Sequence, residues 1–76
     1  MPKNTYPTLD VKVIVGRSVK MLRKEAGISQ DVLAERCGIF RTYLSRVESG
    51  QANVTISVLA ALATVLGVKI NAFFEE

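Results

Sequence analysis

Residues 30–50, QDVLAERCGIFRTYLSRVESG, predict two short amphipathic helices joined by a tight turn. Apolar residues on each side of Gly38 recur at the spacing that the buried face of a helix requires. Those residues are Leu33, Ala34 and Cys37 before the glycine, and Leu44 and Val47 after it. Gly38 suits the left-handed backbone that ends a helix with little strain. We therefore expect a crossed pair of short helices.

The first of these helices carries further local signals. Ser29 precedes it and can accept a hydrogen bond from a free N–H of the first turn, where Asp31 also complements the helix dipole. Ala34 lies one turn before the glycine, at a place where a larger side chain would push the second helix away. Ile39 is expected to fill the space between the helices. We assign Ala34 and Gly38 structural roles in the turn.

The second helix, expected over about residues 41–49, turns a polar and cationic face outward once its apolar residues are buried. That face consists of Arg41, Thr42, Ser45, Arg46 and Ser49. An arginine in the first turn of a helix opposes the helix dipole, so Arg41 does not serve helix stability. Arginine pairs bidentately with guanine, and hydroxyl side chains bond to bases or phosphates. A solvated face on an ordinary helical hairpin is the alternative; the spacing and the chemistry together favour binding to duplex DNA.

Several segments together resemble the lambda-repressor-like, Cro/XRE-type helix-turn-helix family. They are Ser29-Gln30, Leu33-Ala34, Gly38-Ile39 and the run LSRVESG at residues 44–50, and the resemblance extends over about residues 15–74. It implies an all-α, five-helix DNA-binding domain that regulates transcription. Within this family, RTYLS at residues 41–45, followed by NVT at residues 53–55, is similar to the controller proteins of restriction–modification systems.

Two groups of DNA-contacting residues are predicted. Those expected to read bases are Arg41, Thr42, Tyr43 and Arg46. Those expected to contact phosphates are Arg17, Lys20, Gln30, Ser45, Gln51 and Asn53. A helix is also expected from Thr8 or Asp10 to Glu25 or Ala26. The resemblance supplies Gln30 and the two basic residues of that helix, and the hydroxyl and amide chemistry of exposed positions supplies the others. The alternatives are a merely solvated first helix and a plain turn at residues 50–53.

The resemblance also implies an ion pair between Arg23 and Glu48. Glu48 follows the core residue Val47 and is expected to lie too close to the core to be left unpaired. Removing one partner of a fully buried pair would lower the free energy of unfolding by about 3–5 kcal/mol. We interpret both residues as structural.

A helix over residues 56–66, capped by Thr55 and ended by Gly67, is apolar over most of its circumference. One stripe, with Leu59 and Leu62, is expected to face the core, and a second stripe consists of Val58, Ala61 and Val65. A helix of this kind must be covered on two sides. We expect a second copy of the chain to provide that cover, joined by Ile70, Phe73 and Phe74 from a short fifth helix. The alternative is that the fifth helix folds back over the second stripe.

Three positions depart from the family pattern. Phe40 stands where serine or threonine commonly caps the second helix of the motif, and loss of that cap removes about 1 kcal/mol of support. The Phe40 ring either packs on the scaffold, which we favour, or meets a thymine methyl group. Val54 replaces a common proline, and Lys69 replaces a usual cap, so the last helix is expected to be short or frayed.

Composition limits the remaining possibilities. The chain has 76 residues, one cysteine, no histidine and a net charge of +3. We expect a flexible arm over residues 1–8, one domain over residues 9–76, and Cys37 as a small core hydrophobe. No catalytic constellation, metal-ligand cluster, cofactor motif, signal peptide or membrane span is apparent, so a cytoplasmic protein that is not an enzyme is expected.

The sequence therefore predicts a homodimeric regulator that binds a palindromic operator in double-stranded DNA. Its two half-sites would lie about one helical turn, ~34 Å, apart. Occupancy would block or recruit RNA polymerase. The alternative is an antitoxin-type module that binds a protein and also regulates its own operon.

Overall fold

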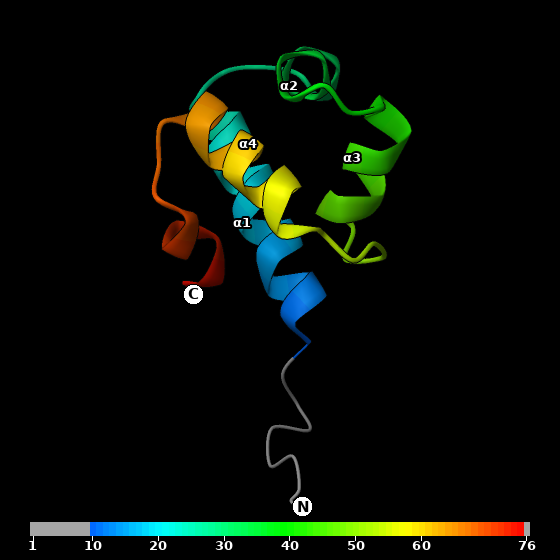
Figure 1. The fold of residues 1–76 in the computed structure, drawn as a ribbon, viewed down its shortest axis with the longest axis vertical. Coiled ribbons are helices and arrows are strands. Elements are labelled where there is room, and N and C mark those ends of the chain that lie inside the picture. Colours follow the sequence, from blue (N-terminus) through cyan, green and yellow to red (C-terminus); the bar gives the residue numbers. More distant parts are fainter. Residues whose placement is uncertain (1–9, 76) are drawn as a thin grey trace, which may run out of the picture.

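The computed structural model describes residues 10–75, which form an all-helical fold (Figure 1). The elements are α1 Val11–Glu25, α2 Gln30–Cys37, α3 Arg41–Glu48, α4 Ile56–Leu66 and the 3-10 helix η1 Ile70–Phe74. The all-α class is confirmed, and the fifth helix, expected to be short or frayed, is a 3-10 helix rather than an α-helix. Lys69 provides no side-chain cap, and the five residues after it close the tighter turns of a 3-10 helix. Within residues 10–75, no helix combines the length and apolarity needed to cross a membrane.

The ends of the helices follow from local chemistry. The side chains of Ser29 and Thr55 each accept a hydrogen bond of 3.1 Å from the backbone N–H three residues later, as predicted. Gly38 and Gly67 each end a helix with φ of 71°, in the left-handed region that glycine tolerates. The expected arm at residues 1–8 lies outside the described residues.

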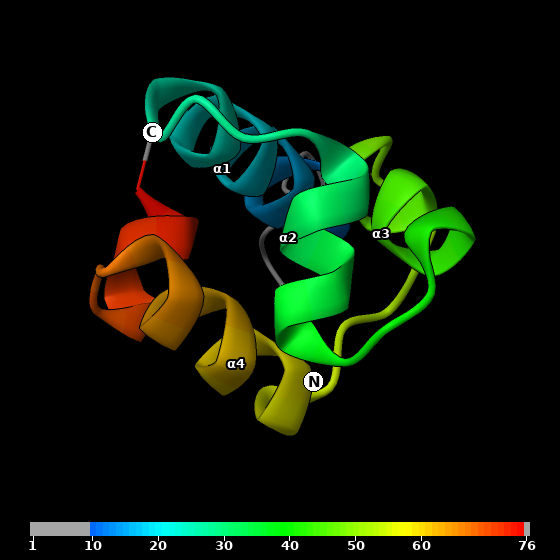
Figure 2. The ribbon, with the colours of Figure 1, turned by 90° about the horizontal axis from the view of Figure 1, so that it is seen from above.

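α1 runs through the middle of the fold and packs against α3 on one side and η1 on the other. Figures 1 and 2 both show α3 and η1 on opposite sides of the molecule. All five elements contribute to a single core, whose largest fully buried side chains are Val19, Leu33, Leu44, Val47, Leu62 and Phe73. This core fixes the position of α3 on the rest of the chain.

The backbones of α1 and α3 approach closely at Gly16. A Cβ atom at Gly16 would overlap the carbonyl oxygen of Val47 and would lie 3.0 Å from the carbonyl oxygen of Glu48. Because only glycine lacks this atom, Gly16 permits α1 to support the C-terminal end of α3 directly. No local pattern in the sequence marks this glycine as necessary.

One residue of the surface expected to meet a second copy lies inside the core. Phe73 is 0% exposed and belongs to the core, so its assignment to an intersubunit surface is wrong. The 3-10 turn directs Phe73 inward and leaves Ile70 and Phe74 exposed. The second stripe of α4, Val58, Ala61 and Val65, is half-buried, which means that the chain itself covers part of it.

Cys37 is half-buried and packs against the core at the end of α2. Burial raises the pKa of the Cys37 thiol above its usual value, because the thiolate is poorly solvated there. The thiol therefore stays protonated at neutral pH and fills space as a small apolar group.

Candidate nucleic-acid interface

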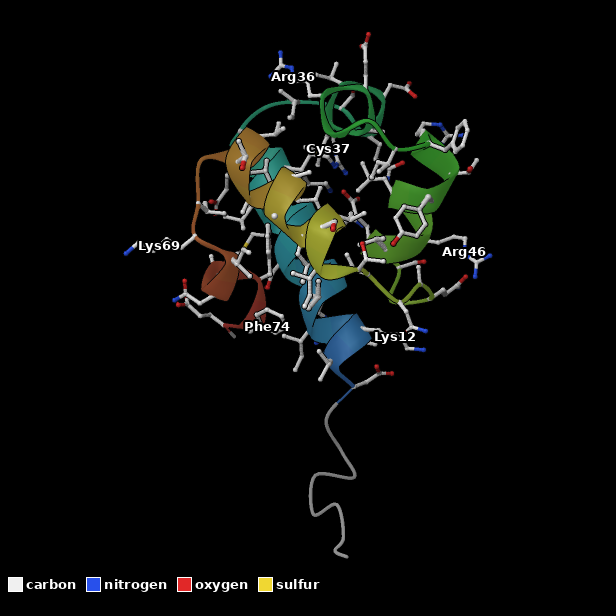
Figure 3. The ribbon with its side chains drawn as sticks, in the orientation of Figure 1. Lys12, Arg36, Cys37, Arg46, Lys69 and Phe74 are labelled. Carbon is white, nitrogen blue, oxygen red and sulfur yellow. The ribbon has the colours of Figure 1, made fainter. Side chains whose placement is uncertain are left out.

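α3 separates its apolar and cationic residues onto two faces. Leu44 and Val47 are buried, whereas Arg41, Thr42 and Arg46 are exposed. Figure 3 shows the Arg46 side chain extending away from the body of the molecule. The outer face of α3 therefore presents guanidinium and hydroxyl groups, which can donate hydrogen bonds to the acceptor atoms of base edges in the major groove.

The carboxylate of Glu48 points away from this face and is held among three elements. Its Oε2 accepts a hydrogen bond of 2.7 Å from Arg23 Nε, and its Oε1 accepts one of 3.0 Å from Arg23 Nη2. The side chains of Arg23 and Glu48 are only 11% and 3% exposed. The predicted pair is therefore present, and the hydrogen bond to Glu48 raises the pKa of Arg23.

Two further contacts extend this buried pair. Arg23 Nη1 donates to the carbonyl oxygen of Ile28 at 3.0 Å, and Gln30 Nε2 donates to Glu48 Oε1 at 2.9 Å. Gln30, predicted to bind a phosphate, thus uses one of its amide N–H groups inside the protein. The sequence does not predict the hydrogen bond between Gln30 and Glu48, because this bond joins the first turn of α2 to the last turn of α3.

Arg41 lies next to Asp31 at the other end of α3. Arg41 Nε is 3.4 Å from Asp31 Oδ1, and both side chains are exposed. This contact uses the Nε edge of the guanidinium and leaves the two terminal amino groups available. Those two groups can bond in parallel to the O6 and N7 acceptors of a guanine.

The loop after α3 folds back onto that helix. The Tyr43 hydroxyl donates to the carbonyl oxygen of Asn53 at 3.0 Å, and the Gln51 N–H donates to the carbonyl oxygen of Arg46 at 2.8 Å. Arg46 Nη2 also lies 3.5 Å from the carbonyl oxygen of Gln51. Tyr43 is half-buried by this contact, so the structure gives it a role in holding the loop beside α3.

A shallow hollow lies between α3 and this loop. Its lining residues are Phe40, Thr42, Tyr43, Arg46, Gln51, Ala52 and Asn53. Three predicted base-contacting residues and two predicted phosphate-contacting residues therefore lie around one depression. Ser45 is half-buried on the same helix and does not line the hollow.

Arg17 and Lys20 lie elsewhere. They border a hollow on the outer face of α1 together with Met21, Lys24 and Glu25, and no residue of α3 lines it. By contrast, Lys12 at the start of α1 lines the same hollow as Asn53, and Figure 3 shows it on the same side of the molecule as Arg46. Lys12 is not among the site residues predicted from the sequence.

Phe40 contradicts the expectation that its ring packs on the scaffold. The residue is 82% exposed, the largest exposed fraction among the large apolar side chains of residues 10–75. It occupies the cap position of α3 and makes no side-chain cap hydrogen bond. A backbone held by the turn at Gly38 places this position outside the core, which a one-dimensional apolar pattern does not show.

Comparison with known proteins gives a consistent family. The helix-turn-helix model HTH_3 matches residues 19–73. Control protein C.SmaI of Serratia marcescens is 37% identical over 70 residues, covering 92% of this chain and 83% of that protein. The immunity repressor protein of Bacillus phage phi105 is 37% identical over 62 residues, covering 82% of this chain, and the chain spans only 43% of that repressor.

A solved structure agrees with these relatives. The restriction–modification controller protein C.AhdI from Aeromonas hydrophila has a TM-score of 0.80 and 36% identity, with 83% of this chain and 96% of that chain covered. The chain therefore belongs to the Cro/XRE-type helix-turn-helix family of DNA-binding transcriptional regulators.

Proposed function

We propose that a homodimer of this chain binds a palindromic operator, with α3 of each copy in a major groove of duplex DNA. The division of charge on α3 carries this proposal. Arg41 and Arg46 are exposed, whereas Glu48, the only carboxylate of the helix, is buried against Arg23. A helix whose cations face outward and whose anion is neutralised inside suits the negative potential of DNA.

Base contacts come from the exposed face of α3, through Arg41, Thr42 and Arg46. Tyr43 acts at the edge of this set, because its hydroxyl already holds Asn53. The phosphate contacts that we propose at the rim come from Lys12, Gln30, Ser45, Gln51 and Asn53. Arg17 and Lys20 reach a phosphate only if the DNA extends around the outer face of α1.

The dimer follows from the size of the recognition helix and from exposed apolar residues. α3 has eight residues, so it is about 12 Å long and spans only part of one half-site. Val11, Ile56 and Phe74 are exposed, and Val11 and Phe74 border a groove with Val54 and Leu59. We propose that a second copy covers this groove. Residues of the loop after α3 also line it, so a second copy seated there would lie close to the proposed DNA-binding surface.

Sedimentation of two matched variants tests this surface. Val11 and Met21 are 52% and 53% exposed on the same helix, but only Val11 borders the groove. Val11→Glu should produce monomers, whereas Met21→Glu should leave the mass of the wild-type dimer unchanged. If both variants form dimers of the same stability, the groove is not part of the dimer interface.

The relatives favour a regulator of the controller type. The proteins C.SmaI and C.AhdI are named as a control protein and a restriction–modification controller protein. We propose that occupancy of the operator blocks or recruits RNA polymerase at a promoter. The antitoxin alternative is not favoured by these relatives, which are named as control proteins and a repressor.

Binding to a selected operator tests the DNA-contacting surface. The operator is obtained by selection from random duplex DNA, and Kd is measured by fluorescence anisotropy on that operator and on a scrambled duplex. Arg46→Ala should weaken operator binding by about 1–3 kcal/mol and leave binding to the scrambled duplex nearly unchanged.

Arg36→Ala is the matched control for charge. Arg36 lies on α2, and Figure 3 shows it at the top of the molecule, away from Arg46. Arg36→Ala should weaken binding to the operator and to the scrambled duplex equally, and only slightly. An equal loss on both duplexes for Arg46→Ala would make Arg46 a phosphate contact, and failure of the selection to enrich any sequence would contradict operator binding.

A further inference from the structure

The position of Phe40 is not explained by the stability of the fold. Its ring is 82% exposed, and its side chain makes no cap hydrogen bond to α3. A serine or aspartate at a helix cap is favoured over an apolar residue, so Phe40 leaves N–H groups of α3 without a cap. An exposed aromatic ring that also replaces a cap points to a ligand.

The surroundings of Phe40 indicate which ligand. Among the exposed large apolar residues within residues 10–75, Phe40 alone lines the hollow between α3 and its following loop. The other lining side chains include Thr42, Tyr43, Arg46 and Asn53, which are polar or cationic. An apolar protein partner would have to desolvate those groups, whereas a DNA groove meets them with phosphates and base edges.

The chemistry of the ring then restricts the contact within the groove. Phe40 immediately precedes Arg41, and the N-terminal residues of a recognition helix are those that approach base edges. A phenyl ring has no hydrogen-bonding group for the donor and acceptor pattern of the bases. The apolar group that the major groove presents is the 5-methyl group of thymine.

We propose that Phe40 is a specificity-determining residue that contacts the 5-methyl group of one thymine in each half-site, next to the base read by Arg41. This inference rests on the proposed operator binding by α3. Removal of the methyl group leaves base pairing and the hydrogen-bonding pattern of the major groove intact. The contact therefore contributes only through burial of apolar surface.

Replacement of thymine by deoxyuridine isolates this contribution. In the selected operator, each symmetry-related pair of thymines is replaced in turn, and Kd is measured for the wild-type protein by fluorescence anisotropy. Burial of one methyl group corresponds to about fourfold in affinity, so one pair should weaken binding by about sixteenfold in total. The other pairs should have smaller effects.

Variants assign that effect to Phe40. Phe40→Ala should bind the thymine and deoxyuridine operators equally at the sensitive pair, whereas Phe40→Leu should retain part of the difference. Met21→Ala, at an exposed apolar residue on the outer face of α1, should retain all of it. Thermal unfolding of each variant shows whether the fold is intact.

The outcomes separate this inference from the proposed function. Absence of a deoxyuridine-sensitive pair, or full sensitivity in Phe40→Ala, would overturn the role of Phe40 while leaving operator binding in place. Unchanged operator binding in Arg46→Ala would instead contradict the proposed function of α3. A uniform loss of affinity in Phe40→Ala, with thymine discrimination preserved, would also overturn the inference.

Discussion

Two arginine–carboxylate pairs lie at opposite ends of α3 and differ in geometry and burial. At the C-terminal end, Glu48 receives two hydrogen bonds from Arg23, and water barely reaches either side chain. At the N-terminal end, Arg41 has a single 3.4 Å contact with Asp31, and the two side chains are 50% and 80% exposed.

This difference shows that the two ends of one short helix serve different purposes. The buried pair cannot exchange partners without stranding a charge in the core, so it holds the helix on its scaffold. The exposed pair gains little in free energy and can release its guanidinium to DNA. Four substitutions test this contrast through the free energy of unfolding, measured by urea denaturation.

Glu48→Ala should have the largest effect. It leaves the Arg23 guanidinium buried without its carboxylate, so the free energy of unfolding should fall by about 3–5 kcal/mol. Glu35→Ala, at an exposed carboxylate on α2, should change it by less than about 0.5 kcal/mol. If the free energy of unfolding falls by a similar amount in both variants, burial of the Arg23–Glu48 pair does not contribute to stability beyond an exposed carboxylate.

Gly16→Ala should have the next largest effect. The added methyl group would overlap the Val47 carbonyl oxygen, so the free energy of unfolding should fall by about 1–3 kcal/mol. Alanine is otherwise preferred over glycine inside a helix by about 1 kcal/mol, so the sign of the change is informative. The exposed Lys24→Ala in the same helix is the control, and a more stable Gly16→Ala protein would rule out the close backbone approach.

Phe40→Ser, at the N-terminal end of α3, should stabilise the protein. A serine hydroxyl can accept a hydrogen bond from a free N–H of the first turn, which should raise the free energy of unfolding by about 1 kcal/mol. Phe40→Ala removes the same exposed ring without adding a cap and should not show the gain. Equal stability of the two variants would show that the α3 terminus is already satisfied.

Asp31→Asn should have the smallest effect. It removes the exposed contact with Arg41 and one charge near the N-terminus of α2, and the free energy of unfolding should fall by less than about 1 kcal/mol. A loss as large as that of Glu48→Ala would contradict the division between the two ends of α3.

The features predicted from the sequence are those that depend on neighbouring residues. The caps at Ser29 and Thr55 and the glycine at position 38 act within one turn of a helix, so the amino-acid types alone indicate them. The burial of Leu44 and Val47 follows from helical spacing, and it determines which residues of α3 face outward. The pairing of Arg23 with Glu48 came from the family resemblance, because 25 residues separate the partners.

The features that sequence reasoning missed depend on segments far apart in the chain. Gly16 is required because α1 crosses the end of α3, and no local pattern shows that crossing. Phe73 and Phe74 are adjacent and chemically identical, and only the 3-10 geometry of η1 decides which one is buried. The exposed ring of Phe40 contradicts the predicted packing, because an apolar side chain is not necessarily a buried one.

The contacts of Glu48 have a consequence for how this regulator can acquire new targets. One carboxylate joins α1, the start of α2 and the end of α3, and all of these bonds lie on the inner side of the helix. Substitutions at the outward positions therefore leave the architecture intact. Duplicated copies of such a gene can diverge in the sequences that they bind while each copy still folds.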